Sequence, residues 1–159
     1  MATKPHVLIT GAAGLVGGII RQHWGDRYRL RLADIQPVSD LADHEESIKL
    51  DIRDLEAFTE ACRDIDVVLH LAADRSPSAD FYETLIDLNL IGCYNGFEAA
   101  RRSGCRRVVF ASSINAVLGY RGSRAVPWDV PIFPQNVYGA TKCLGEALGG
   151  GDGDQHEGS

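Results

Sequence analysis

The stretch His6-Val-Leu-Ile-Thr-Gly-Ala-Ala-Gly-Leu-Val-Gly17 decides the fold of this 159-residue chain. Its first five residues are mainly apolar and β-branched, which predicts a buried strand. Glycines at positions 11, 14 and 17 follow, and apolar side chains then recur at helical spacing as far as Trp24. A helix N-terminus presents free backbone N–H groups, so a strand, a glycine turn and a helix in this order favour an anion site.

The rest of the chain repeats this alternation of strand and helix. Apolar runs predict four more strands, and capping residues with helical spacing predict three more helices. Because the strands lack a polar alternation, both faces of their sheet should be covered. We therefore predict an α/β fold with a doubly wound parallel sheet in a three-layer αβα arrangement. The predicted strands are 28–34, 47–51, 66–72 and 107–112, and the predicted helices are 54–62, 80–103 and 135–148.

Composition narrows the classes of function. A formal charge of −6 argues against a general binder of nucleic acid, which needs a basic surface. No apolar run is long enough to span a bilayer and no signal-peptide core precedes the first strand, so we expect a cytoplasmic protein without a membrane partner. The cysteines lack the spacing of a metal or redox pair, which predicts free thiols and no metal site. They are Cys62, Cys93, Cys105 and Cys143.

The glycine turn and the acid after the second predicted strand together indicate a dinucleotide site. Gly11 permits a tight turn, Gly14 lets the backbone approach a pyrophosphate, and Gly17 lets the helix pack closely on the sheet. At Asp34 a carboxylate can accept hydrogen bonds from ribose hydroxyls and repel a 2′-phosphate, which favours NAD over NADP. A flexible turn and an ordinary strand-end acid are the alternatives. Asp51, after the third strand, can meet the adenine amino group or simply form a turn.

Tyr138 and Lys142 stand four residues apart and share one face of a predicted helix. An ammonium beside a phenol stabilises the phenolate, and such a phenol can take a proton from an alcohol while hydride leaves its carbon. Ser112 and Ser113, at the end of the fifth predicted strand, can hold the same substrate oxygen. An exposed Tyr–Lys pair on an ordinary helix is the alternative, because so short a motif carries little specificity.

Five motifs, in this order and spacing, resemble the short-chain dehydrogenase/reductase superfamily. They are Thr10–Gly17, His70-Leu-Ala-Ala73, Asn89-Leu-Ile-Gly92, Phe110-Ala-Ser-Ser113 and Tyr138-x-x-x-Lys142. The resemblance covers about residues 5–148 and is to the extended branch, which includes nucleotide-sugar epimerases and dehydratases. Gly119-Tyr120 and Val137-Tyr-Gly139 resemble the uronate and aldose dehydrogenases of that branch. Those sequences usually carry polar residues directly after the second serine, where this chain has Ile114 and then Asn115.

The resemblance implies a Rossmann-type fold, NAD as the cofactor and a sugar or nucleotide sugar as the small-molecule substrate. It implies that Tyr138 is the acid/base, that Lys142 binds the nicotinamide ribose and tunes Tyr138, and that Ser113 orients the substrate oxygen. Asn89 would support the site from the long helix. The residues implied for cofactor binding are Gly11, Gly14, Leu15, Val16, Gly17, Asp34, Asp51, Ile52, Leu71, Ala72, Ala73, Asn89, Ser112, Tyr138 and Lys142.

The resemblance ends before the family pattern does. Family members continue into further strands and most of the substrate-binding part, whereas a Gly/Asp-rich run follows Leu148 here. We therefore predict an NAD-binding domain at 1–148, a disordered tail at 149–159, and no C-terminal substrate-binding part. An exposed edge at the fifth strand predicts a homo-oligomer, and the two long helices resemble the pair that forms the dimer in the family. Three functions stay open: a sugar dehydrogenase, an epimerase or dehydratase that retains NAD, and an NAD-binding module without turnover.

Overall fold

A five-stranded parallel sheet forms the centre of the computed structural model, which describes residues 4–120, 122 and 125–151. The strands stand in the order β3-β2-β1-β4-β5, and every neighbouring pair is parallel. The chain therefore winds outward in both directions from β1, which confirms the predicted doubly wound α/β fold. The strands are β1 His6–Thr10, β2 Arg29–Asp34, β3 Glu45–Lys49, β4 Val67–His70 and β5 Arg107–Phe110.

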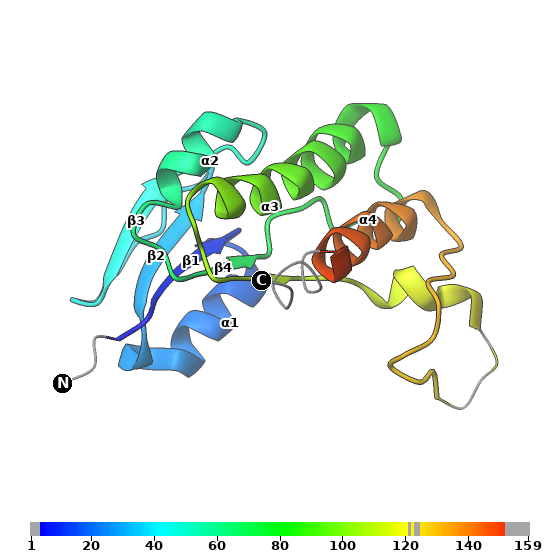
Figure 1. Ribbon diagram of the computed structural model, residues 1–159, viewed down its shortest axis with the longest axis horizontal. Helices are drawn as coiled ribbons and strands as arrows, with labels where there is room; N and C mark the ends of the chain where they lie inside the picture. The colour runs from blue at the N-terminus through cyan, green and yellow to red at the C-terminus, as the bar shows by residue number, and fades with distance from the viewer. Residues whose placement is uncertain (1–3, 121, 123–124, 152–159) are drawn as a thin grey trace, which may run out of the picture.

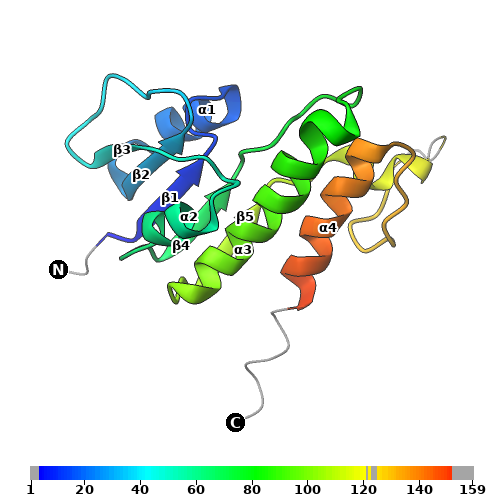
Figure 2. The same cartoon turned by 90° about the horizontal axis from the view of Figure 1, so that it is seen from above.

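Helices cover both faces of the sheet and complete the three layers (Figure 1). The helix α1 lies on one face, α2 and α3 lie on the other, and α4 lies beside α3 (Figure 2). Leu8 packs in the core on the α2–α3 side, whereas its neighbours Val7 and Ile9 pack on the α1 side, as alternation along a strand requires. The helices are α1 Leu15–Trp24, α2 Leu55–Ala61, α3 Gly92–Arg102 and α4 Val137–Gly151, with the short 3₁₀ segments η1 Gly25–Arg27 and η3 Ile114–Tyr120 and the π-helical η2 Phe81–Ile91.

Side-chain caps fix two of the helix starts at the residues that the sequence predicts. Asp54 Oδ1 accepts a hydrogen bond from Ala57 N at 2.9 Å. Asp80 Oδ1 accepts from Tyr82 N at 2.8 Å and from the next amide at 2.9 Å. The start of α1 differs, because Gly14 has no side chain to cap the first turn. The first N–H groups of α1 are therefore left for another partner.

Several boundaries differ from the sequence-based prediction. The segment predicted as one helix over 80–103 is wound as the π-helix η2 up to Ile91 and continues as α3. β3 begins at Glu45, two residues earlier than predicted, because backbone pairing with Leu30 outweighs the low strand preference of glutamate. α4 reaches Gly151, past the predicted end at 148, and the remainder of the predicted tail, 152–159, lies outside the described residues.

The strand order reverses at β1 and β4, and this reversal positions a site. From β1 the chain goes outward to β2 and β3, and it then returns to the other side of β1 for β4 and β5. The loops after β1 and β4 consequently leave in opposite directions, and a crevice opens at the carboxyl ends of these strands. Open parallel sheets bind their ligands at such a point.

Candidate functional site

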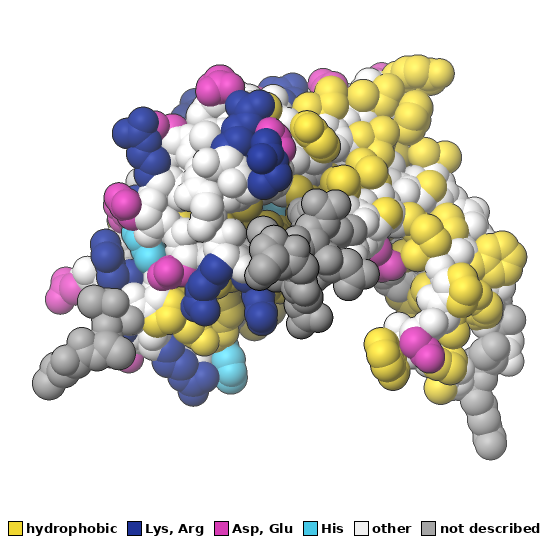
Figure 3. Space-filling model, in the orientation of Figure 1, with side chains coloured by type: hydrophobic (Ala, Val, Ile, Leu, Met, Phe, Trp, Pro, Cys, Tyr) yellow, Lys and Arg dark blue, Asp and Glu magenta, His cyan; other side chains and the backbone are white. Residues whose placement is uncertain are grey.

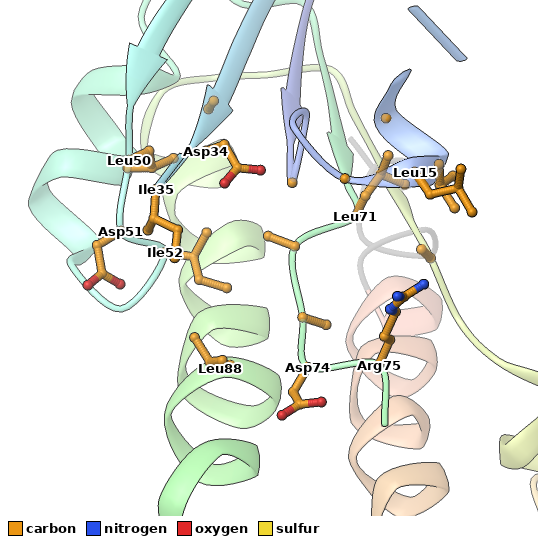
Figure 4. Close-up of a pocket in the computed structure, with 18 of the residues that line it drawn as sticks. Leu15, Asp34, Ile35, Leu50, Asp51, Ile52, Leu71, Asp74, Arg75 and Leu88 are labelled. Atoms are coloured by element: carbon orange, nitrogen blue, oxygen red, sulfur yellow. The ribbon is translucent and has the colours of Figure 1, made fainter. Parts of the chain in front are cut away.

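A cleft of about 570 Å³ opens beyond the carboxyl ends of the strands, at the point where the strand order reverses (Figure 4). The glycine turn, the loops after β2, β3 and β4, the end of β5 and one face of α4 contribute to its lining. The cleft brings together every residue predicted for cofactor binding except Asn89. Residues between positions 11 and 142 therefore converge on one place, although they come from the end of β2, from the turns and loops after all five strands, and from α1, η2 and α4.

The glycine turn reaches the cleft because it passes very close to neighbouring backbone. Gly11 has a φ of +71°, and a Cβ at this position would lie 2.9 Å from the backbone nitrogen of Ala72. A Cβ on Gly17 would lie 2.8 Å from the carbonyl oxygen of Ala12. Any side chain at these two positions would displace backbone. The turn thereby holds the uncapped start of α1, with its free N–H groups, at the cleft.

Two carboxylates line the cleft, Asp34 as the last residue of β2 and Asp51 in the loop after β3 (Figure 4). Asp34 accepts a hydrogen bond from Ala13 N at 3.0 Å and another from Gln36 N at 2.9 Å, one on each oxygen. Each oxygen of Asp34 can still accept a further bond. Asp51 is paired with Arg53 at 2.6 Å, and this hydrogen bond lowers the pKa of Asp51. Asp34 therefore keeps acceptor capacity for a ligand, whereas much of that of Asp51 is taken by Arg53.

Tyr138 and Lys142 lie one turn apart on α4, and both line the cleft. Both are buried, with exposed fractions of 6% and 5%. Lys142 Nζ donates to the carbonyl oxygen of Ala111 at 3.0 Å, and it lies 4.9 Å from the ring centre of Phe110 and 5.9 Å from that of Tyr138. Burial lowers the pKa of Lys142, while the carbonyl and the two rings hold its ammonium form in place. The arrangement sets a buried cation behind a phenol.

The two predicted serines differ in their surroundings. Ser112 lines the cleft, and its Oγ donates to a carboxylate oxygen of Glu146, one turn beyond Lys142 on α4. Ser113 stands outside the cleft lining, and its Oγ accepts hydrogen bonds from the backbone and side-chain nitrogens of Asn115, both at 3.2 Å. Within the described part of the chain the hydroxyl proton of Ser113 has no acceptor, so it can be donated elsewhere.

Asn89 acts from behind the cleft. It is 3% exposed, its Oδ1 accepts from Asp74 N at 2.8 Å, and its Nδ2 donates to Asp74 O at 3.0 Å and to Thr141 Oγ1 at 3.2 Å. One buried amide thus ties the loop after β4 to α4. These hydrogen bonds hold the wall of the cleft, while a direct role of Asn89 in cofactor binding stays a prediction.

Sequence reasoning missed seven residues of the lining. Asp74 and Arg75, in the loop after β4, are the charged ones. Two charged residues directly after a buried strand, at the carboxyl edge of a parallel sheet, were a usable signal for them. The apolar ones gave no signal beyond their nearness in sequence to predicted residues. They are Ala33, Ile35, Leu50, Leu88 and Ala111.

A buried histidine lies behind the site at the end of β4. His70 is 1% exposed, and its Nδ1 shares a hydrogen bond of 2.7 Å with Thr10 Oγ1 at the end of β1. Its ring packs against Phe58 and Phe110, with ring centres 5.7 and 6.1 Å away. Burial, with a smaller contribution from the charge of Lys142, lowers the pKa of His70 to about 4. The ring is therefore neutral near pH 7 and joins the ends of two central strands.

The described residues do not form a metal site or a membrane span. Within 4–120, 122 and 125–151, no three His, Cys, Asp or Glu side chains come close enough together to hold a metal ion. The described helices are also too short or too polar to cross a membrane. All four cysteines are free thiols. The cytoplasmic location stays a prediction.

The family model of the NAD dependent epimerase/dehydratase family matches residues 7–150. The chain belongs to this family. A uronate dehydrogenase of Pseudomonas putida is 35% identical over 150 residues, which cover 92% of this chain and 55% of that enzyme. An NAD-dependent glucose-6-phosphate dehydrogenase of Haloferax volcanii is 34% identical over an alignment of length 169. The alignment covers 95% of this chain and 64% of that enzyme. A solved uronate dehydrogenase of Agrobacterium tumefaciens, a mutant complexed with NAD, matches with a TM-score of 0.78 and 35% identity, covering 91% of this chain and 54% of that one.

These matches confirm the predicted superfamily and the resemblance to uronate and aldose dehydrogenases. The chain spans about half the length of the uronate dehydrogenases it matches. The range that the family model matches, 7–150, contains the described sheet from Val7 onward and every residue of the cleft.

Proposed function

We propose that this chain binds NAD in the cleft and that it oxidises a hydroxyl group of a sugar or nucleotide sugar with Ser113, Tyr138 and Lys142 at the reacting end. The observation that carries the proposal is that Tyr138 and Lys142 line the same cleft as the glycine turn and Asp34. One cleft joins dinucleotide-binding groups to a phenol backed by a buried cation. Coupled transfer of a hydride and a proton requires such a combination.

The residues of the cleft fit NAD. The volume of about 570 Å³ lies within the usual range for a cofactor site. The uncapped start of α1 offers N–H groups and the positive end of its dipole to a pyrophosphate. Asp34 offers its remaining acceptor capacity to the ribose hydroxyls, and its charge repels a 2′-phosphate, which supports NAD over NADP. The NAD complex of the Agrobacterium relative adds support.

The protein's own groups handle the proton. NAD, when bound, supplies the hydride acceptor. Tyr138 takes the proton of the substrate hydroxyl as the C–H bond breaks and the C=O bond forms. Lys142, fixed by the carbonyl of Ala111, stabilises the phenolate of Tyr138. Ser113, whose oxygen already accepts two hydrogen bonds from Asn115, donates a hydrogen bond to the substrate oxygen and keeps its own proton.

The proposed class of substrate follows from the relatives. Two of them are named for a uronate and for glucose 6-phosphate, which are a sugar acid and a sugar phosphate. A dehydrogenase forms net NADH from such a sugar. The family also includes epimerases and dehydratases, in which the hydride returns to the substrate and net NADH does not form. Product analysis therefore separates these two proposals.

Cofactor binding is tested on the purified chain by the mass of any dinucleotide it releases and by calorimetric titration with NAD and NADP. We expect NAD to bind more tightly than NADP. Asp34→Ala should narrow this difference, because it removes both the ribose hydrogen bonds and the repulsion of a 2′-phosphate. Asp43→Ala, which removes an exposed acid outside the cleft, is the matched control. Equal affinity of the unmutated chain for NAD and NADP would contradict the assignment of Asp34.

Turnover is tested by NADH formation with D-glucuronate, D-glucose 6-phosphate and UDP-glucose. Tyr138→Phe should lower the rate by about 100-fold or more and change the affinity for NAD far less than the rate, because only the hydroxyl is lost. Tyr28→Phe should retain the full rate, because that ring packs on Trp24 and does not line the cleft. Retained NAD with an epimerised or dehydrated product would identify the alternative reaction. NAD binding without any product would reduce the proposal to a binding module.

Self-association is also proposed. β5 is the edge strand of the described sheet, and Val109 on it is 44% exposed. Apolar side chains gather over η2 and α4, whereas charged side chains gather over the half of the molecule that holds β3 and α2 (Figure 3). Tyr82 and Ile91 of η2 are 81% and 43% exposed, and Val137 of α4 is 52% exposed. A contiguous apolar surface of this kind favours association. Light scattering should give at least twice the mass of one chain, and a monomer at all concentrations would contradict this.

A further inference from the structure

Two cysteines that stand far apart in the sequence meet in the fold. Cys62 caps the C-terminal end of α2 and Cys105 follows α3, 43 positions further along the chain. The Sγ of Cys105 donates to the carbonyl oxygen of Cys62 at 3.8 Å, and Cys105 packs against the core cluster to which Cys62 belongs. Both are free thiols. Their spacing in the sequence gives no sign of this pair, because the packing of α2 and α3 brings its members together.

The backbone is held on both sides of the pair. Cys62 N donates to Thr59 O at 3.1 Å, in the last turn of α2. Cys105 N donates to Ala100 O at 2.9 Å, just past the end of α3. Ser103 Oγ donates to Thr59 O at 3.1 Å and ties the two helix ends together. The two thiols therefore extend from backbone segments that are fixed relative to each other, as a disulfide between them requires.

The two thiols differ in exposure and in acidity. Cys62 is fully buried, whereas Cys105 is partly exposed. A hydrogen bond from the thiol of Cys62 lowers the pKa of Cys105, against the opposing effects of burial and of the charge of Asp66. The same hydrogen bond, together with burial, raises the pKa of Cys62. Cys105 is therefore the thiolate that an oxidant from solvent reaches first, and Cys62 stays protonated beside it.

We propose that Cys62 and Cys105 form a redox modification site, which a peroxide converts into an intramolecular disulfide. The Cys105 thiolate attacks one oxygen of hydrogen peroxide, the O–O bond breaks, and a sulfenic acid forms; the departing hydroxide takes up the proton that Cys105 released. The sulfur of Cys62 then attacks the sulfur of Cys105, the S–O bond breaks, and the proton of Cys62 leaves with the hydroxyl group as water. The two thiols lose two electrons, and one peroxide becomes two waters.

The first step prepares the second. When Cys105 becomes a sulfenic acid it loses its negative charge, so the strongest cause of the raised pKa of Cys62 is removed. The thiol of Cys62 is then easier to deprotonate, and it already lies beside the sulfur that it attacks. Rapid attack by Cys62 protects the sulfenic acid from oxidation by a second peroxide.

The modification site is separate from the cleft. Cys62 precedes β4 and Cys105 precedes β5, so both lie at the amino-terminal ends of these strands, whereas the cleft lies beyond the carboxyl ends. A disulfide here would close a loop that contains β4, η2 and α3, and it would hold α2 against α3 on their shared face of the sheet (Figure 1). The inference does not rest on the proposed function, because neither thiol lines the cleft.

The test treats the reduced chain with hydrogen peroxide, blocks the remaining thiols and identifies the cross-link by mass spectrometry. Trypsin leaves each cysteine in a peptide of its own, at 54–63, 76–101, 103–106 and 143–159. Peptides 54–63 and 103–106 should become joined with the loss of two hydrogens, in a chain that runs as a single chain on a denaturing gel without reductant. Peptides 76–101 and 143–159 should stay reduced. Absence of this cross-link, or oxidation of Cys105 to a sulfinic acid in its place, would overturn the proposal.

Three variants separate the two steps. Cys105→Ser should abolish the cross-link, and Cys62→Ala should leave a sulfenic acid on Cys105 that dimedone labels. Cys143→Ser is the matched control, because the Sγ of Cys143 also donates to a carbonyl oxygen at 3.8 Å, but to that of Ala116. This control should cross-link like the unmutated chain. A cysteine bond in Cys105→Ser at the same peroxide concentration, or the loss of the cross-link in Cys143→Ser, would contradict the assignment of the pair.

The cross-linked chain should also melt at a temperature about 5 °C or more above that of the reduced chain, because the bond restricts a long loop of the unfolded state. Dithiothreitol should reverse this gain, and Cys105→Ser should show none after the same treatment. An equal or lower melting temperature of the cross-linked chain would count against the proposal, because it would show that the bond does not fit the folded backbone.

Discussion

The buried His70 should make the free energy of unfolding decrease as the pH falls from 7 to 5, which is above the pH range in which most carboxylates titrate. The folded chain holds the ring neutral down to about pH 4, whereas the unfolded ring takes a proton near the ordinary value of 6.5. Between these values the unfolded state binds more protons, so the free energy of unfolding decreases as the pH falls. From pH 7 to pH 5, linkage with these two pKa values gives a loss of about 2 kcal/mol.

The assay is urea unfolding of the full chain at pH 7 and pH 5, compared with His70→Asn. Asparagine can keep a hydrogen bond to Thr10 and has no charge to gain, so the variant should lose about 2 kcal/mol less between the two pH values. The variant is also less stable at pH 7 because the ring contacts are gone, but only the difference between the two pH values is compared. His23→Asn, which replaces an exposed histidine of α1, should keep the wild-type dependence. Identical pH dependence of the wild type and His70→Asn would refute the reasoning.

Three substitutions test the framework around the cleft. Asp54→Ala removes the cap of α2 and should lower the free energy of unfolding by about 1 kcal/mol in urea titration. Gly17→Ala places a Cβ 2.8 Å from the carbonyl oxygen of Ala12, so we expect a loss of about 1–3 kcal/mol together with weaker NAD binding; an unchanged melting temperature would contradict this. Asn95→Leu deprives the buried carbonyl of Ile52 of its 2.9 Å hydrogen bond and should cost about 1–3 kcal/mol, with faster amide hydrogen exchange in the loop after β3 as a second readout.

The positions set by local chemistry were predictable from the sequence. The strand before Gly11, the cap at Asp54 and the helical pair Tyr138 and Lys142 each depend on neighbours within a few residues, and the structure has all of them. The acid at Asp34 was predictable because a parallel sheet brings the ends of its strands to one edge. For this reason nearly the whole predicted cofactor set lines one cleft.

The details that depend on distant partners were not predictable. The π winding of η2 keeps apolar residues on one side much as an α-helix does, so the spacing of Leu85 and Leu88 gives no sign of it. The place of Asn89 behind the wall depends on a loop fifteen residues away and on Thr141 of α4. The direction in which the Arg75 side chain points depends on the path of the loop after β4, which the sequence leaves undetermined.

The central place of β1 in the sheet has a consequence for how the chain is made. During synthesis from the N-terminus, β1 can pair with β2, and β2 with β3, as soon as these emerge, but the other edge of β1 waits for β4, sixty residues further along at the Thr10–His70 contact. Closing so long a loop is slow, and the open edge of β1 can meanwhile pair with other nascent chains. The two walls of the cleft meet only when β4 docks. Gain of ligand binding during refolding would therefore report long-range steps that are later than the formation of the first half-sheet.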